Sequence, residues 1–480
     1  MKRMYKISSA FFLIMMAGAF IISCKTTNGD ETSGYEVTAY FTSPDKTYLL
    51  EKLDDRVVER SSASDDLIDI EPDIEYQTMD GFGYALTGGS AMLLHQMSAS
   101  ARQNILNELF GAGEGELGIS YLRVSIGASD LDPETFSYND LPAGQTDTDL
   151  SEFSIDPDKE YLIPILKEIL QINPDIKIMG SPWSAPVWMK TGADNTMPTR
   201  GGELNPIYHE VYANYFVKYI QAMAEEGITI DAITIQNEPH HPGNNPSMYM
   251  GASQQASFIK EALGPAFENA GIQTKIVIWD HNCDEPEYPI SILNDPNAKA
   301  YIDGSAFHLY GGEITALSTV KSAHPDKNLY FTEQWIGAPG NFSQDLQWNV
   351  RNLIIGATRN WSKNVLQWNL AADQNQDPHT DGGCTSCLGA ITINGDNVTR
   401  NPGYYTIGQG SKLVRPGSIR IESNEINGFE NVVFKREDGS IVVILLSTGS
   451  NPAIVDLGLK EQIFRVQMNP GEVASLLFEK

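Results

Sequence analysis

The sequence predicts an α/β protein in which a (β/α)8 barrel, the TIM-barrel fold, carries an appended all-β sandwich. Between residues 75 and 412, short apolar runs alternate with amphipathic stretches, which is the pattern of repeated βα units around a parallel sheet. After residue 412 the chain changes to short β-type runs separated by Gly, Asn, Asp and Pro, which is typical of an all-β module. Polar and aromatic residues recur where the apolar runs end, and a barrel gathers those ends at one face.

The N-terminus has the features of an export signal. Basic residues come first, and an apolar stretch at 11–22 follows that is too short to predict a stable membrane-spanning helix. Residues 21–24, Ile-Ile-Ser-Cys, resemble the lipobox of bacterial lipoproteins. We therefore expect a lipoprotein signal peptide at 1–23, lipidation of Cys24 and a polar tether at 24–34. Such a chain is held in the bacterial cell envelope by its lipid alone, at the periplasmic face or the cell surface. An ordinary secretory signal is the alternative.

The barrel is predicted over residues 75–412. Its expected strands are 81–86, 119–125, 176–181, 232–236, 275–279, 304–308, 329–332 and 365–369. The expected helices include 98–110, 159–171, 208–226, 253–269 and 345–361, and in 208–226 the apolar residues recur at a spacing near 3.6. A doubly wound open sheet is the alternative, but such a sheet does not usually need this many strands.

Two separated regions are expected to form the sandwich. The C-terminal region, 413–480, has β-type runs at 418–422, 432–435, 441–447, 453–457, 463–467 and 472–478. The N-terminal region, 35–74, is also β-like, with runs at 35–50, 56–59 and 66–70. We expect its strands to join the C-terminal ones in one sandwich beside the barrel.

Composition limits the possible partners. The 480 residues include 33 basic and 62 acidic side chains, which gives a formal net charge of −29. A charge of that sign opposes binding to nucleic acid and to anionic membrane surfaces. It does not oppose an uncharged substrate such as a neutral glycan.

Two glutamates are the strongest candidates for catalysis. Glu238 follows the apolar run 232–236, and Glu333 follows 329–332. A pair of carboxylates at strand ends is what retaining glycoside hydrolysis requires, with one as nucleophile and the other as acid and then base. An isolated glutamate at a strand end is more often a salt-bridge partner. The alternative from another functional class is therefore a non-catalytic glycan-binding lipoprotein.

A resemblance to a known family rests on six segments: 121–130 (Tyr-Leu-Arg-Val-Ser-Ile-Gly-Ala-Ser-Asp), 181–186 (Ser-Pro-Trp-Ser-Ala-Pro), 236–239 (Gln-Asn-Glu-Pro), 307–310 (Phe-His-Leu-Tyr), 332–335 (Thr-Glu-Gln-Trp) and 368–370 (Trp-Asn-Leu). In this order they resemble glycoside hydrolase family 30, from Tyr76 to the C-terminus. That family includes glucosylceramidases, glucuronoxylanases, β-fucosidases and endo-β-1,6-glucanases. The segment 382–389 looks closest to the β-1,6-glucanase branch.

The resemblance implies a role for each matching residue. Glu238 is expected to be the general acid/base and Glu333 the nucleophile, with Arg123 favouring the anionic form of Glu333. The expected substrate contacts are Asp130, Trp183, Asn237 and Trp368, together with His308 and Tyr310, which should also orient Glu333. Trp188 and Trp335 are weaker candidates for sugar platforms.

The resemblance also implies an activity. We expect a retaining hydrolase of β-linked glucan, with endo-β-1,6-glucanase favoured and no cofactor. Glucosylceramidase, β-glucosidase and xylanase activities of the same family are the alternatives.

The cysteines and histidines do not predict a metal site. In an exported protein, Cys384 and Cys387 fit a small loop disulfide better than half of a zinc site, because no second cysteine pair completes the ligand set. Cys283 is then expected to be free and buried. His240, His241 and His281, taken with Asp280, lack a metal-ligand spacing, so we expect them to line a cleft and expect no metal.

Overall fold

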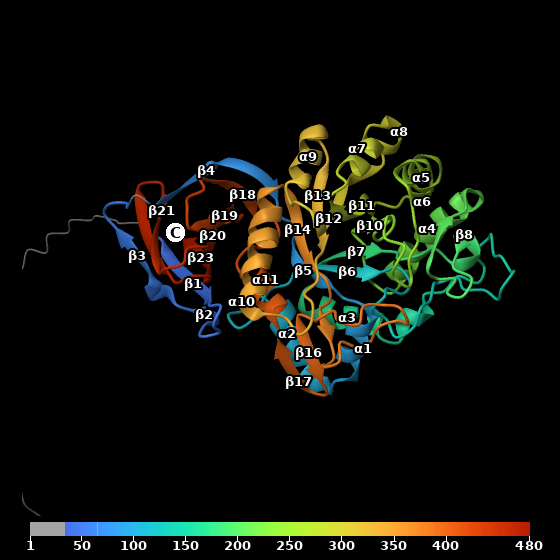
Figure 1. Cartoon of the computed structure of the whole chain (residues 1–480), viewed down its shortest axis with the longest axis horizontal. Helices are drawn as coiled ribbons and strands as arrows, with labels where there is room; N and C mark the ends of the chain where they lie inside the picture. Colours follow the sequence, from blue (N-terminus) through green and yellow to red (C-terminus); the bar gives the residue numbers. More distant parts are fainter. Residues whose placement is uncertain (1–33, 65) are drawn as a thin grey trace, which may run out of the picture.

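The computed structural model describes residues 34–64 and 66–480 (Figure 1). The predicted signal peptide at 1–23, the predicted lipidation site Cys24 and nearly all of the predicted tether at 24–34 lie outside these residues. Within the described part, no helix is long and apolar enough to cross a membrane. Figure 1 shows two bodies, a barrel wrapped by helices and a β-sandwich in which the first and last strands of the chain lie together.

The barrel is closed and its strands are parallel, which confirms the predicted fold class. Going round it, β5 pairs with β6, the order continues through β7, β10, β11, β12 and β13, and β14 returns to β5. The strands are β5 (Gly81–Ala85), β6 (Tyr121–Ser125), β7 (Lys177–Ser181), β10 (Ala232–Thr234), β11 (Lys275–Cys283), β12 (Ile302–Gly312), β13 (Asn328–Glu333) and β14 (Ser362–Gln367).

Side chains fill the inside of the barrel. Seven of its strands each contribute one buried residue to a single cluster, which consists of Tyr121, Met179, Ala232, Val277, Ala306, Tyr330 and Leu366. The barrel is therefore a packed core rather than a pore, and a ligand has room only above this layer, at the strand ends.

Helices surround the barrel as the amphipathic stretches predict. They are α1 (Gly88–Gln96), α2 (Ala99–Phe110), α3 (Leu162–Ile172), α4 (His209–Glu225), α5 (Ala252–Phe258), α6 (Gly264–Ala270), α7 (Glu287–Leu293), α8 (Pro296–Lys299), α9 (Ala316–Ala323), α10 (Phe342–Asn349) and α11 (Pro402–Ser411). Two predicted helices are not purely α-helical. The first widens to a π-helix over Ile259–Leu263, just before Pro265, which has no N–H to continue the α-helical pattern. The second widens over Val350–Ala357.

The sandwich has strands from both ends of the chain, as predicted. Its strands run in the order β2, β1, β23, β20, β19, β18, β4, β21, β22 and β3. Their bounds are β1 (Glu36–Thr42), β2 (Leu49–Lys52), β3 (Val57–Arg60), β4 (Leu67–Thr78), β18 (Ile419–Ser423), β19 (Phe429–Lys435), β20 (Ile441–Ser447), β21 (Ala453–Leu459), β22 (Gln462–Met468) and β23 (Val473–Glu479). Strand β4 continues past the expected boundary at residue 74, because Thr78 still pairs with Ile419 of β18.

Further short strands lie in the loops of the barrel. A hairpin follows β7 and consists of β8 (Lys190–Ala193) and β9 (Gly201–Leu204). A small sheet follows β14 and consists of β15 (Ala371–Ala372), β16 (Ile391–Asn394) and β17 (Asn397–Arg400). Neither the hairpin nor the small sheet is predicted from the sequence, since their strands are short and lack a clear alternation of apolar and polar residues.

Hydrogen bonds fasten the sandwich to the barrel. Arg359, which follows the second π-helical segment, donates from Nε to the carbonyl of Asn431 at 2.6 Å and from a terminal nitrogen to that of Ser423 at 3.0 Å. On α11, Gln409 donates to the Thr42 hydroxyl at 2.7 Å and accepts at its carbonyl from Ser475 at 2.6 Å. The two bodies are therefore joined through buried polar contacts.

Candidate active site

The two glutamates lie at the carboxyl ends of the fourth and seventh barrel strands. Glu333 is the last residue of β13, whereas Glu238 lies four residues beyond the short β10. The backbone of Glu238 has φ of 44°, in the left-handed region that side chains other than glycine rarely adopt. Its N–H donates to the Asp280 carbonyl at 3.0 Å and its own carbonyl accepts from His241 at 2.8 Å, so the strained turn is held from both sides.

Both oxygens of Glu333 are held in place. The fully buried Arg123 of β6 donates to Oε2 at 2.6 Å, and the Tyr310 hydroxyl of β12 donates to Oε1 at 2.9 Å. Arg123 also donates to Asn237 Oδ1 at 2.7 Å, which turns the amide nitrogen of Asn237 away from the arginine. Arg123 thus lies where the sequence analysis expects it, against Glu333.

His308 lies beside both glutamates and is closer to Glu238 than to Glu333. Its Nδ1 lies 2.9 Å from Glu238 Oε1 and 3.8 Å from Glu333 Oε1. Its Nε2 lies 3.1 Å from Asp280 Oδ1. Which strand carries the histidine can be read from the sequence, but the direction of its ring depends on Asp280, which arrives from the neighbouring strand.

The shared imidazole limits the distance between the two carboxylates. The two Oε1 atoms can be no farther apart than the sum of their distances to His308 Nδ1, 2.9 and 3.8 Å. Retaining glycosidases place their carboxyl groups roughly 5–5.5 Å apart, and inverting ones roughly 6.5–9.5 Å apart. This limit concerns one oxygen of each carboxylate, and it is compatible with the spacing of a retaining enzyme.

Asp280 is expected from the sequence only as a cleft residue without an assigned role, yet its side chain connects the predicted site residues. It is fully buried in the carboxyl-terminal half of β11 and follows Trp279, with both residues at positive φ. Its oxygens accept from Arg123 (2.8 Å), Ser181 (2.7 Å), Thr234 (2.7 Å), Thr332 (2.7 Å) and His308 (3.1 Å). Burial alone raises the pKa of Asp280, but Arg123 and these donors bring it well below its usual range. Its position next to His281 near a strand end places it in the cleft, but its role depends on partners from other strands of the barrel.

The pKa values of Glu238 and Glu333 shift in directions opposite to those that an acid/base residue and an anionic nucleophile would suggest. Burial raises the pKa of Glu238, but the neighbouring His281 and His308 imidazoles more than offset this and lower it. Burial also raises the pKa of Glu333, and Arg123 and His308 do not reverse the effect. Burial lowers the pKa of His308, but the Glu333 charge and the bonds to Asp280 and Glu238 raise it to about 9. These pKa directions favour the form in which His308, rather than Glu238, carries the proton of their hydrogen bond.

A pocket of about 380 Å³ opens above the two glutamates. This volume falls within the range of small-ligand sites, roughly 300–1,000 Å³. The indole rings of Trp183 and Trp368 stack at 5.4 Å and form one wall. The other lining residues are Asp130, Glu238, His241, Asn244, His281, Asn282, Tyr310, Glu333, Trp335, Cys384 and Cys387. Trp188 does not line this pocket, since its indole N–H donates to the Asn139 carbonyl at 3.0 Å.

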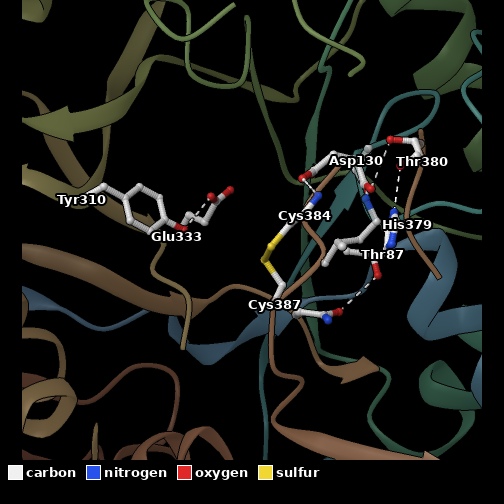
Figure 2. Close-up of a disulfide and its surroundings, with 11 residues drawn as sticks. Thr87, Asp130, Tyr310, Glu333, His379, Thr380, Cys384 and Cys387 are labelled. Atoms are coloured by element: carbon white, nitrogen blue, oxygen red, sulfur yellow. Dashed lines mark hydrogen bonds between the residues drawn. A yellow bond between two sulfur atoms is a disulfide. The ribbon is translucent and has the colours of Figure 1, made fainter. Parts of the chain in front are cut away.

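A disulfide forms part of the pocket wall. Cys384 and Cys387 are bonded to each other, and Figure 2 shows the bridge with Asp130 at one side and Glu333 with Tyr310 at the other. The backbone N–H of Cys384 donates to Asp130 Oδ2 at 3.2 Å. Burial and the Glu333 charge raise the pKa of Asp130 to about 7, although the Cys384 bond lowers it. Cys283 is buried and has no disulfide partner among the described residues.

Glu238, His281 and His308 also bring metal-ligand atoms within 4.8 Å of one another. Both ring nitrogens of His308 already contact carboxylates, and its raised pKa favours the imidazolium form. An imidazolium has no free lone pair for a metal ion. The donor set therefore suits proton transfer better than metal binding, and the absence of a metal stays a prediction.

Known proteins resemble the chain over most of its length. Residues 79–414 match the family model of the glycosyl hydrolase family 30 TIM-barrel domain, and residues 417–473 match that of the glycosyl hydrolase family 30 beta sandwich domain. An endo-1,6-β-D-glucanase of Aspergillus fumigatus is 35% identical over 80% of this chain and 81% of its own length. One of Neurospora crassa is 34% identical over 82% and 83%. The solved structure of the endo-β1,6-glucanase BT3312 is 35% identical, with a TM-score of 0.85 over 93% of this chain and all of that one.

Proposed function

The chain belongs to glycoside hydrolase family 30, a family of retaining glycosidases, and we propose that it cleaves β-1,6-glucan within the polymer. The convergence of Glu238 and Glu333 at one face of the barrel is the observation that carries the chemistry. The linkage is proposed from the relatives, since two endo-1,6-β-D-glucanases are 34–35% identical over four fifths of the chain.

In the first step, Glu333 attacks the anomeric carbon of the sugar. A bond forms between a carboxylate oxygen and that carbon while the bond to the glycosidic oxygen breaks, and Glu238 gives the departing oxygen a proton. Arg123 and Tyr310 fix the direction of Glu333, so the nucleophile needs little rearrangement before it reacts. The sugar is then an ester of Glu333.

In the second step, water replaces Glu333. Glu238, now a carboxylate, removes a proton from the water as the water oxygen bonds to the anomeric carbon and Glu333 departs. Two inversions at one carbon leave the product in the β-configuration. Conversion of Glu333 to a neutral ester removes the like charge beside Glu238, which suits its change from acid to base.

His308 supplies the proton for the first step through the hydrogen bond between its Nδ1 and Glu238 Oε1. The raised pKa of His308 favours its carrying that proton, and the lowered pKa of Asp280 favours a carboxylate on the other side of the ring. Transfer along the 2.9 Å hydrogen bond converts Glu238 to the acid form that the leaving group needs. Glu238 and His308 thus act as one proton-carrying pair.

The remaining residues hold the sugar. Asn237 is held by Arg123 at its oxygen, so its amide nitrogen can donate to the sugar 2-hydroxyl. Asp130 accepts from other hydroxyls, and Trp183 and Trp368 provide apolar faces. None of these contacts requires a charged substrate.

The proposal is tested by assaying the wild type and Glu333→Gln on β-1,6-, β-1,3- and β-1,4-linked glucans and on a glucosylceramide. We expect the wild type to release a series of oligosaccharides from the β-1,6-linked polymer, and the variant to lose at least about three orders of magnitude in rate. Glu461→Gln, in the exposed β21–β22 turn, is the control. Undiminished turnover by Glu333→Gln would refute the mechanism, and release of glucose alone would refute cleavage within the polymer.

We also propose that the protein is anchored to the bacterial envelope by lipid on Cys24, which the N-terminal sequence supports. The full chain, expressed in a bacterium, should partition into the detergent phase of a Triton X-114 extract. Cys24→Ala should move it to the aqueous phase while the rate on soluble oligosaccharide stays unchanged. A wild type that partitions into water would favour an ordinary secretory signal instead.

A further inference from the structure

The loop that follows the acid/base residue extends well beyond the catalytic pocket. This loop, residues 239–250, connects Glu238 to the start of α5. His241 and Asn244, in its first half, line the catalytic pocket. Tyr249, near the end of the loop, is 36% exposed and lines two other hollows. The loop is therefore a continuous path from the site of chemistry to a separate surface.

The β8–β9 hairpin fixes the outer part of this loop. The backbone N–H of Tyr249 donates to the Gly202 carbonyl at 2.8 Å, and that of Ser247 donates to the Thr199 carbonyl at 3.1 Å. The largely buried Lys190 donates to the carbonyls of Thr199 and Ser247, both at 3.0 Å. Loop and hairpin thus form one preformed wall rather than a mobile flap.

Two hollows lie along this wall, with volumes of about 990 and 590 Å³. Both are lined by Thr191, Glu203 and Tyr249, and we call these two adjoining hollows together the groove. The larger hollow reaches the first residues of α4 and α5, and helices of a (β/α)8 barrel begin at the face where its strands end. The groove therefore opens at the same face as the catalytic pocket, although the two share no lining residue.

The chemistry of the groove suits a neutral polysaccharide. The Tyr249 ring is stacked on the His240 ring at 5.2 Å and 5°, so an aromatic platform is held in one orientation. The carboxylates of Glu203 and Glu210 can accept bonds from sugar hydroxyls. With Glu261 and Asp194 also lining the groove against the single Arg200, an anionic ligand would meet an excess of negative charge there and a chain whose net charge is −29.

We infer that this groove binds the part of the β-glucan chain on the leaving-group side of the cleaved bond. The inference rests on the proposed function, because it takes Glu238 as the proton donor. A proton donor contacts the oxygen that departs, so the loop that begins at Glu238 lies on the side of the departing chain. Long substrates reach Tyr249 and gain transition-state stabilisation there, whereas short ones do not.

The test compares substrates of different length on wild-type protein, Tyr249→Ala and Thr191→Trp, which fills the groove without altering the tyrosine. The substrates are β-1,6-glucan polymer and an aryl β-glucoside, whose leaving group is too short to reach the groove. In both variants we expect kcat/KM on the polymer to fall about tenfold and that on the aryl glucoside to stay within about twofold. Trp348→Ala, an exposed aromatic on α10 that lines neither hollow, is the matched control and should change neither.

The outcomes separate the groove from the proposed function. Equal rates of polymer cleavage in wild type and both variants would overturn the inference, as would a loss of the same size on both substrates. A wild type that cleaves only another β-glucan would overturn the proposed linkage, and the length comparison would then be made on that glucan. A loss of kcat/KM that is confined to the long substrate would still support binding of the glucan chain in the groove.

Discussion

At the scale of single residues, one imidazole lies among three carboxylates. His308 is within 2.9 Å of Glu238, 3.1 Å of Asp280 and 3.8 Å of Glu333. Three acidic neighbours favour the imidazolium despite complete burial, which is why the pKa of His308 rises to about 9. The acid/base residue can therefore be ionised at rest and still have a proton within one hydrogen bond.

His308→Asn should move the alkaline limb of the pH–rate profile. The first step needs the proton of the Glu238–His308 pair, so the wild-type kcat/KM should fall as the pH rises through about 9. Asparagine cannot carry that proton, so the limb should shift to lower pH by at least about one unit, and the rate at the optimum should fall about a hundredfold.

The control for this profile is His95→Asn, an exposed histidine on α1, which should leave the limb in place. A slower His308→Asn enzyme with an unmoved limb would mean that the histidine is only structural.

Much of the residue-level site is predictable, because a barrel forces the ends of its strands to one face. That rule places Glu238, Glu333 and Arg123 together without any knowledge of side-chain direction. It does not tell which carboxylate the His308 ring contacts, since that depends on Asp280 from an adjacent strand. The pKa shifts of Glu238 and Glu333 depend in turn on that contact, and so they cannot be read from the sequence.

At the scale of elements, the loop with the disulfide positions Asp130. The bridge closes a loop of sequence separation 3, and so short a loop is stabilised by only about 2 kcal/mol through chain entropy. Its larger effect should be local, because the Cys384 N–H is bonded to Asp130 and both sulfurs line the pocket.

Replacing both Cys384 and Cys387 by Ser should therefore impair binding more than folding. We expect KM for the glucan to rise about tenfold, kcat to stay within about threefold, and the melting temperature to fall by a few degrees. Steady-state kinetics and a thermal melt measure these values, with Cys283→Ala as the control for a cysteine outside the pocket. A large loss of thermal stability with unchanged KM would contradict the positioning role.

The elements differ in how well the sequence predicts them. The helix 208–226 is found because its apolar face repeats at the helical period, and structure gives His209–Glu225. The β8–β9 hairpin is missed because its residues are polar and glycine-rich, and its stability comes from Lys190 and the 239–250 loop rather than from its own pattern. Tertiary contacts determine such elements, and no local periodicity reveals them.

At the scale of the whole molecule, Arg359 is a main link between barrel and sandwich. It is largely buried and donates to the carbonyls of Asn431 and Ser423. Arg359→Ala should leave these acceptors unsatisfied and lower the free energy of unfolding by about 3 kcal/mol, as measured by urea denaturation. Arg351→Ala removes an exposed ion pair with Glu430 between the same two bodies and should have little effect. Equal effects of the two variants would contradict a special role for Arg359.

The overall architecture follows from sequence because two periodicities alternate over most of the chain and one of them then stops. The union of N- and C-terminal strands is also predictable, since an isolated β-like segment such as 35–74 needs partners for its hydrogen bonds. The precise boundary between the sandwich and the barrel is not predictable, because β4 runs without interruption from the sandwich to the entry of the barrel.

The proposed mechanism depends most on the identity of the nucleophile. The ester that the nucleophile forms with the sugar can be trapped. A 2-deoxy-2-fluoro β-glucoside with a good leaving group slows both steps but slows hydrolysis of the ester more, so the covalent intermediate should accumulate. We predict that peptide mass spectrometry of the inactivated enzyme finds the fluorosugar on Glu333. A label on Glu238 or on another residue, or turnover without any covalent adduct and with inverted product, would contradict the account.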